Sequence, residues 1–286
     1  MTPRQGTAGQ GKDTRFVIIG AGISGVLMAI KLLESGYRNF TILEKAAEMG
    51  GTWRDNTYPG VGCDVAAHLY SYSFARNPWW RTRYGKGADI RDYYHRVARR
   101  YGVLPHIAYG CEVTSAVLEA GRWVLTTRGG GTYAADIVIA ATGRLHHPVV
   151  PDIAGLESFA GASFHTARWD HSVPLAGKRV GVIGTGSTAT QIVTALAGKV
   201  ARLTVFQRTA QWVFPVKDTP NPWWKRLAWA LSRRNWESYY RQLRSETEAR
   251  GKAATSSEEG RRARDQVCLD ALAAIRDPQL RAKLTP

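Results

Sequence analysis

The same short pattern occurs twice in this chain, and it restricts the fold more than any other feature. The first copy is the apolar run RFVII, the turn GAGISG, a helical stretch and a second apolar run, NFTIL, which is followed by Glu44. The second copy is KRVGVI, GTGSTA, another helical stretch and RLTVF, with Arg208 close behind. A strand, a glycine-rich turn, a helix and a second strand form the start of a dinucleotide-binding sheet. The sequence therefore predicts an α/β fold with two Rossmann-like domains.

The glycines of the first copy have separate physical roles. Gly20 permits the tight turn between strand and helix, Gly22 lets the backbone approach a pyrophosphate, and Gly25 allows the helix to pack closely on the strand. The start of the helix then offers unpaired N–H groups to phosphates. A glycine-rich turn without a ligand is the alternative, but the flanking strand, the helix and the terminal acid favour a nucleotide site.

The two copies differ in the charge that follows the second strand. Glu44 lies 19 residues after Gly25, where a carboxylate binds ribose hydroxyls and repels a 2′-phosphate. Arg208 lies 19 residues after Ala189, and a guanidinium there attracts that phosphate, although a solvated arginine at a strand end is the alternative. The first site suits FAD or NAD and the second suits NADP. Two such sites in one chain indicate hydride transfer from a nicotinamide to a flavin.

Four further segments accompany these copies. They are GGTW at 50–53, YPGVGCDVAAHLYSYSF at 58–74, IVIAATG at 137–143 and the string Phe159-x-Gly161-x-x-x-His165-x-x-x-Trp169-Asp170. The string resembles the fingerprint of the Baeyer–Villiger monooxygenases, a family of class B flavin-dependent monooxygenases. All five of its fixed positions match, and it directly precedes the second glycine turn, as in that family. The resemblance extends from about Arg15 to the end of the chain.

This resemblance implies which residues bind each cofactor. The implied FAD contacts are Gly20, Gly22, Ser24, Gly25, Glu44, Thr52, Trp53, Asp64, Tyr70, the backbone of Val113, and Gly143 in the Ala-Thr-Gly turn. The implied NADPH contacts are Gly184, Thr185, Gly186, Ser187, Thr188, Ala189, Thr190, Gln191, Arg208 and Thr209.

Three further side chains invite a catalytic interpretation. By resemblance, Asp64 orients a catalytic arginine where flavin and nicotinamide meet; the alternative is a turn aspartate that caps its own loop. We expect His165 to donate to backbone carbonyls rather than to act as a general base. We expect Cys63 to be a small buried side chain rather than a nucleophile.

The family's reaction supplies the expected function. NADPH reduces FAD, the reduced flavin adds O2 to form a C4a-peroxyflavin, and this species attacks a ketone, which becomes an ester or lactone. Oxygenation of nitrogen or sulfur by the same flavin chemistry is an alternative. The family segment that resembles DPQLRAKLTP continues into a Gly-Cys-Lys-Arg stretch, so we expect this chain to be an N-terminal part. A nucleotide-binding fragment without turnover is the non-enzymatic alternative.

The expected domain limits follow the motifs. Residues 1–13 read as a loose tail, 14–150 as the FAD-binding domain, 151–176 as a linker containing the fingerprint, and 177–286 as the NADPH-binding domain with a helical insertion. In that insertion large apolar and aromatic residues recur at helical spacing, and we expect them to form a core stripe. They are Trp224, Leu227 and Leu231, followed by Trp236, Tyr239, Tyr240 and Leu243. A helix lying in a membrane interface is the alternative.

Composition excludes several other classes of protein. The net charge of +16 is spread along the chain without a zinc-finger spacing or an RNP motif, so we expect anionic cofactors rather than nucleic acid as partners. The three cysteines include no CxxC pair, which argues against a disulfide framework, a zinc site and a disulfide reductase. The apolar run from Phe16 to Ile30 contains three glycines and is too short to span a membrane. A reducing cytoplasm fits these features.

Overall fold

The structure is a computed structural model that describes residues 13–255 and 257–286. The tail predicted at 1–13 lies outside the described residues, apart from Asp13. The chain forms two compact units. The first unit contains the residues up to Thr57 together with Ala88–Ala160, and the second contains Tyr58–Gly87 together with Gly161–Pro286. The motif segment from Tyr58 onward is therefore part of the same unit as the second glycine turn.

The first unit is built on a four-stranded parallel sheet with strand order β5-β2-β1-β9. Its strands are β1 (Phe16–Ile19), β2 (Phe40–Leu43), β5 (Ile107–Ala108) and β9 (Ile137–Ala140). Short apolar runs of this kind suit a parallel sheet, which is buried on its faces. Phe16 pairs with Phe40 on one side and with Ile137 on the other. The side chain of Ile18 is fully buried at the centre of this sheet.

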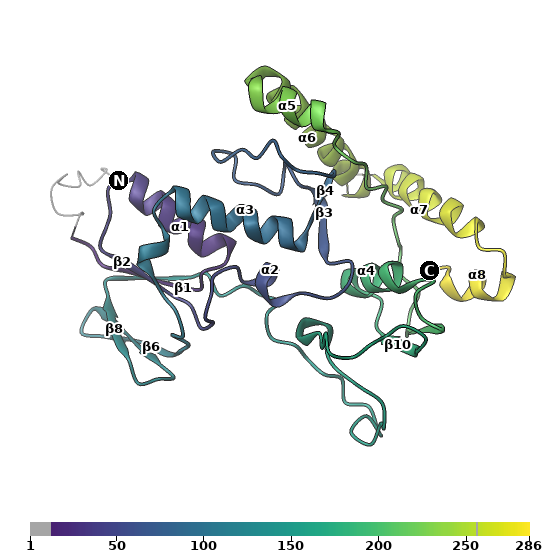
Figure 1. The fold of residues 1–286 in the computed structure, drawn as a ribbon, viewed down its shortest axis with the longest axis horizontal. Coiled ribbons are helices and arrows are strands. Elements are labelled where there is room, and N and C mark those ends of the chain that lie inside the picture. The colour runs from purple at the N-terminus through teal and green to yellow at the C-terminus, as the bar shows by residue number, and fades with distance from the viewer. Residues whose placement is uncertain (1–12, 256) are drawn as a thin grey trace. The chain divides into compact units, whose positions relative to one another are not determined.

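Helices and a second sheet complete the first unit. Helix α1 (Ile23–Glu34) packs on β1 and β2 through an apolar face that includes Val26 and Ile30 (Figure 1). The second sheet is antiparallel and meets the first around Leu125. The remaining elements of this unit are α2 (Thr52–Asp55), α3 (Gly87–Arg100), η1 (Leu104–His106), β6 (Val113–Glu119), β7 (Arg122–Thr127) and β8 (Thr132–Ala135).

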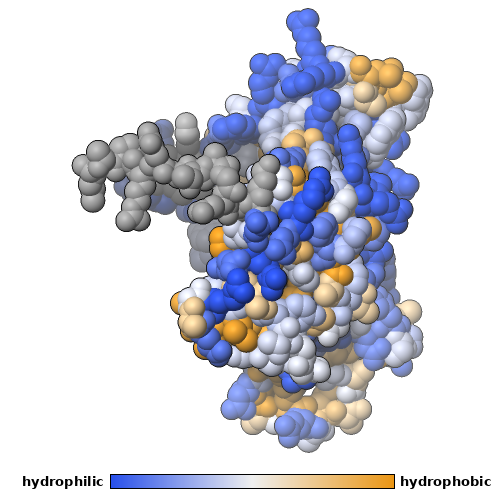
Figure 2. Space-filling model, turned by 90° about the vertical axis from the view of Figure 1, so that its left-hand side faces the viewer, coloured by the Kyte–Doolittle hydropathy of each residue, from blue (hydrophilic) through white to orange (hydrophobic). Residues whose placement is uncertain are grey.

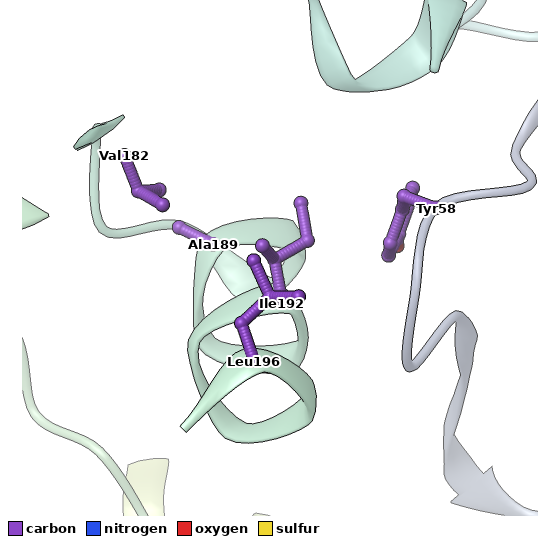
Figure 3. Packing of buried hydrophobic residues seen from close by; sticks show 5 residues of the cluster. All are labelled: Tyr58, Val182, Ala189, Ile192 and Leu196. Carbon is purple, nitrogen blue, oxygen red and sulfur yellow. The ribbon is translucent and has the colours of Figure 1, made fainter. Parts of the chain in front are cut away.

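The second unit repeats the strand-turn-helix arrangement. Strand β10 (Arg179–Ile183) pairs in parallel with β11 (Arg202–Phe206), and helix α4 (Ser187–Leu196) lies between them in sequence. Its core combines Val182 of β10, the α4 residues Ala189, Ile192 and Leu196, and Tyr58 from the distant motif segment (Figure 3). The remaining elements are β3 (Gly62–Ala66), β4 (Tyr84–Lys86), η2 (Thr166–Arg168), α5 (Trp223–Leu231), α6 (Arg233–Thr255), α7 (Glu258–Ala273) and α8 (Pro278–Leu284).

The helical insertion forms, but its predicted core stripe is wrong in part. Trp224, Leu227 and Leu231 of α5 are exposed, Leu231 by 79%. On α6, Trp236 and Leu243 are buried, as predicted. The buried residue of α5 is Trp229, because its ring stacks on Tyr239 of α6 with centroids 4.5 Å apart. Figure 2 shows one face of the molecule, on which hydrophobic residues lie among hydrophilic ones.

The predicted α/β class with Rossmann-like parallel sheets is confirmed by this architecture. Among the described residues, no helix combines the length and the apolar character that a bilayer crossing requires.

Candidate cofactor-binding sites

The first glycine turn starts directly where β1 ends. Gly20 has φ +101°, a conformation that glycine adopts readily, and its N–H donates to the carbonyl oxygen of Leu43 over 2.8 Å. A Cβ on Gly25 would lie 1.9 Å from the carbonyl oxygen of Gly20. Gly25 is therefore required so that α1 can approach β1 this closely.

Two further backbone segments pack against this turn. Gly50 donates its N–H to the carbonyl oxygen of Ala21 over 3.1 Å, and a Cβ on Gly51 would meet Cα of Gly22 at 3.2 Å. On another side, a Cβ on Gly20 would meet the carbonyl oxygen of Ala141 at 2.7 Å. Three glycine-containing segments thus converge at the carboxyl ends of parallel strands, where open α/β sheets bind ligands.

Glu44 follows β2 directly and is held from several directions. Its carboxylate is buried, with 4% of the residue exposed. Oε2 accepts a hydrogen bond from the N–H of Ala21 over 2.8 Å, and Oε1 accepts one from the N–H of Ala46 over 3.0 Å. The backbone N–H of Glu44 donates to Ala108, and its carbonyl accepts from Cys111. The predicted ribose acid is therefore fixed beside the glycine turn.

Arg54 of α2 completes the surroundings of Glu44. Its Nη1 donates to Oε1 of Glu44 over 2.9 Å and to the carbonyl oxygen of Glu48 over 2.6 Å. Nε and Nη2 both donate to Oδ1 of Asp55. Burial lowers the pKa of Arg54, but the hydrogen bonds and charges of Asp55 and Glu44 outweigh it and raise that pKa above its ordinary value.

The second glycine turn has the same backbone geometry as the first. Gly184 has φ +105°, and its N–H donates to the carbonyl oxygen of Phe206, the last residue of β11, over 2.9 Å. Gly186 precedes α4 with φ −68°, and a Cβ added there would have open space around it. Neither α1 nor α4 has a side-chain cap or an acidic residue in its first turn. Their first N–H groups therefore remain suited to bind an anion.

Arg208 differs from Glu44 in its setting. It lies two residues beyond the end of β11 and is exposed, as is Thr209. Within the described parts of the chain, Arg208 forms no ion pair. Its guanidinium is thus accessible to a phosphate, whereas Glu44 is held in place by the protein.

Gln191 of α4 is committed to the protein itself. Its Oε1 accepts hydrogen bonds from the hydroxyl of Tyr58 over 2.9 Å and from the N–H of Gly62 over 3.3 Å. Its Nε2 donates to the carbonyl oxygen of Gly62 over 3.0 Å. The side chain therefore attaches the segment containing Asp64 to the helix that follows the second glycine turn.

Asp64 and its neighbours lie on β3 of the second unit. Asp64 is exposed, while Tyr70 is half-buried in the turn beyond the strand. Burial raises the pKa of the Cys63 thiol to about 11, against the opposing effect of a backbone N–H bond from Val65. A raised pKa disfavours the nucleophilic thiolate at neutral pH, as expected for Cys63. The expectation that Cys63 is buried is wrong, because its side chain is half-buried.

The fingerprint segment contributes structure rather than a base. Nδ1 of His165 accepts a hydrogen bond from the N–H of Ala167 over 3.1 Å and so caps η2. The prediction that His165 donates to backbone carbonyls was wrong in direction, because the helix start next to it offers donors. Trp169 packs against the α4 core and meets Phe164 edge to face at 5.1 Å.

The predicted residues divide between the two units. The first unit contains Gly20, Gly22, Ser24, Gly25, Glu44, Thr52, Trp53, Val113 and Gly143. The second unit contains Asp64, Tyr70, Arg208, Thr209 and all of 184–191. Ser24 and Thr52 are exposed near the starts of α1 and α2, Trp53 is buried, and Val113 packs on the core shared with Leu125.

Sequence reasoning missed Arg54 and Tyr58. Arg54 directly follows the GGTW motif, and Tyr58 opens the YPG motif. Their position beside these motifs was the one signal in the sequence. It did not show that Arg54 bonds to Glu44 or that Tyr58 bonds to Gln191.

Comparison with known proteins places the chain in a family. The model of the pyridine nucleotide-disulphide oxidoreductases matches residues 17–267. The chain belongs to that family. The sequence of this chain contains no CxxC pair, the motif of a redox-active dithiol.

Individual relatives indicate the class of enzyme within this family. An uncharacterized monooxygenase of Mycobacterium tuberculosis is 46% identical over 279 residues, which cover 96% of this chain and 56% of that protein. A Baeyer-Villiger monooxygenase of Streptomyces coelicolor is 43% identical over 285 residues, covering 96% and 53%. The resemblance to class B flavin-dependent monooxygenases is thereby confirmed.

Solved structures agree with this assignment. The NADP+-bound crystal structure of cyclohexanone monooxygenase from Rhodococcus aligns with a TM-score of 0.83 at 31% identity. The alignment covers 96% of this chain and 59% of that one. The chain thus spans between half and two thirds of the length of these relatives.

Proposed function

We propose that the first unit binds FAD, that the second binds NADPH, and that the chain serves a Baeyer–Villiger monooxygenase acting on a ketone and O2. The observation that carries this proposal is the opposite charge of two residues that follow corresponding strands, Glu44 one residue after β2 and Arg208 two residues after β11. Buried Glu44 follows β2, and exposed Arg208 follows β11, each beside a glycine turn of the same geometry. A carboxylate accepts from ribose hydroxyls, whereas a guanidinium binds a 2′-phosphate.

The residues of both turns fit a dinucleotide. In the first turn, the N–H groups at the start of α1 face no side-chain cap, and Gly22 leaves the adjacent space free of a side chain. In the second turn, Gly186 has open space where a pyrophosphate would approach. Each helix would stabilise the phosphates with its N-terminal N–H groups and its dipole.

Bound FAD and NADPH would supply the redox chemistry, since amino acid side chains do not transfer hydrides or activate O2. The chain's residues have the task of binding and orientation. Glu44 would hold the FAD ribose, Arg208 and Thr209 would select the phosphorylated nicotinamide cofactor, and Gln191 would keep β3 attached to α4. We propose that exposed Asp64 orients a cationic side chain at the reacting rings, as the family resemblance implies.

The proposal is tested by cofactor binding to the purified chain. We expect NADP+ to bind more tightly than NAD+. The variant Arg208→Gln should bind NADP+ about 10- to 100-fold more weakly, because one charge-assisted contact to the phosphate is lost. Its affinity for NAD+, which has no 2′-phosphate, should be unchanged. Isothermal titration calorimetry measures all of these values.

Arg202→Gln is the matched control, since Arg202 is an exposed arginine at the opposite end of the same strand. Its affinity for NADP+ should remain that of the unaltered chain. Equal losses in the Arg208 and Arg202 variants, or an equal loss of NAD+ binding, would show that Arg208 does not read the phosphate. Oxidation of NADPH by the FAD-loaded chain then reports whether turnover occurs.

A further inference from the structure

The ion pair between Arg54 and Glu44 has a consequence for how the first unit would hold its flavin cofactor. Both side chains are almost fully buried, with 10% and 5% of their side-chain surface exposed. A buried carboxylate without a partner favours its neutral form or moves toward solvent. The guanidinium of Arg54 is the charged partner of the buried Glu44 carboxylate, and its removal would leave that carboxylate without one.

The hydrogen bonds divide the two carboxylate oxygens of Glu44 into different roles. Oε1 accepts from Arg54 and from the N–H of Ala46, so both of its lone-pair directions are used. Oε2 accepts from the N–H of Ala21. A carboxylate oxygen can accept about two hydrogen bonds, and Oε2 is therefore the oxygen with capacity for a ligand hydroxyl.

Arg54 is itself held in one orientation. Nε and Nη2 donate to Oδ1 of Asp55 over 3.0 and 2.8 Å, and Nη1 reaches the carbonyl oxygen of Glu48. Arg54 also belongs to the short helix that follows Gly51, whose backbone touches the first glycine turn. The Arg54 side chain thus links α2 to Glu44, the residue that follows β2.

We propose that Arg54 is a positioning residue for FAD, which fixes Glu44 so that Oε2 receives a ribose hydroxyl. This inference rests on the proposed binding of FAD to the first unit. It assigns to Arg54 no contact with the cofactor. Arg54 affects FAD binding through Glu44. Its effect on FAD affinity can therefore be separated from an effect on the stability of the fold.

A double-mutant cycle on FAD affinity tests the inference with the 286-residue chain. The variants are Arg54→Met, which removes the charge at similar volume, Glu44→Gln, and the two combined. FAD affinity is measured from flavin fluorescence, and thermal unfolding of the FAD-free chain is recorded alongside. We expect each single variant to bind FAD about 10- to 100-fold more weakly. The double variant should bind no more weakly than the weaker of the two, since Arg54 acts through Glu44.

Arg128→Met is the matched control. Arg128 lies in the same unit and forms a two-point ion pair with Glu112, but that pair is exposed and remote in sequence from the glycine turn. Its removal should leave FAD affinity within about twofold, because surface ion pairs contribute little.

The outcomes separate the two proposals. No FAD binding by the unaltered chain overturns the proposed function and this inference with it. Binding by the unaltered chain with equal affinity in Arg54→Met overturns the inference alone. So does a double variant whose loss is the product of the single losses. If Arg54→Met does not fold, Arg54→Lys enters the same cycle, and multiplicative losses there overturn the inference equally.

Discussion

Gly25 of the first turn and Gly186 of the second have different reasons to be glycine. Gly25 has no room for a side chain, because a Cβ would lie 1.9 Å from the carbonyl oxygen of Gly20. The matching position of the second turn is Ala189, which is buried against the α4 core without such a conflict. Gly186, by contrast, has φ −68° and open space, so the protein itself would tolerate a methyl group there.

We therefore expect Gly25→Ala and Gly186→Ala to fail in different assays. Gly25→Ala should lower the free energy of unfolding by about 3 kcal/mol or more, since the backbone of the turn must shift. Gly186→Ala should change it by less than about 1 kcal/mol, yet weaken NADP+ binding about tenfold or more, because the methyl group meets the approaching pyrophosphate. Urea denaturation and calorimetric titration give the two numbers. A stable Gly25→Ala variant, or unaltered NADP+ binding in Gly186→Ala, would contradict this assignment.

At the scale of residues, the sequence predicts those positions that are determined by spacing within one motif. Gly20, Gly25 and Glu44 occupy the turn and the strand end that their positions imply. The side-chain partners of Glu44 and Gln191 were not predictable from spacing, because each lies on a separate segment that only folding brings close. Gln191 bonds to Tyr58, which lies 133 residues earlier in the chain. No periodicity within one element encodes such a pair.

At the scale of elements, α5 and α6 are attached to the motif segment by a buried aromatic cluster. His68 is 2% exposed and meets Trp229 and Tyr239 edge to face, with ring centroids 4.8 and 5.1 Å away. Burial lowers the pKa of His68 to about 4. The spacing rule predicted a helical insertion but the wrong buried stripe on α5, because His68 and Tyr239 select Trp229 as the inward residue.

His68 should make the second unit sensitive to acid. Its pKa is near 6.5 in the unfolded chain and about 4 in the folded one, so the unfolded state binds the proton first as the pH falls. Stability contributed by neutral His68 is complete above about pH 6.5 and decreases between pH 6.5 and pH 4. At pH 5 we expect a loss of roughly 2 kcal/mol relative to pH 7 from this group.

His68→Phe is the variant that isolates this effect, since phenylalanine keeps the aromatic contacts and does not titrate. Guanidinium denaturation followed by tryptophan fluorescence at pH 7 and pH 5 measures the difference. The loss between the two pH values should be smaller in the variant by about the amount assigned to His68. Equal losses in both proteins would mean that the acid sensitivity arises elsewhere.

At the scale of the whole chain, two nucleotide-binding folds are combined with a net charge of +16. A positive field raises the local concentration of anionic cofactors at both units, but it does not distinguish FAD from NADPH. That distinction depends on single residues at the ends of β2 and β11. The buried acid is fixed before any ligand arrives, whereas Arg208 is exposed. A pre-organised site favours tight binding, so we expect FAD to be retained and NADPH to exchange.

A crystal structure of the chain grown with FAD and NADP+ tests the central claim most directly. The account predicts a ribose hydroxyl of FAD within about 3 Å of Oε2 of Glu44, and the 2′-phosphate of NADP+ against the guanidinium of Arg208. FAD with its ribose away from Glu44, or NADP+ with its 2′-phosphate in solvent and Arg208 directed elsewhere, would contradict it.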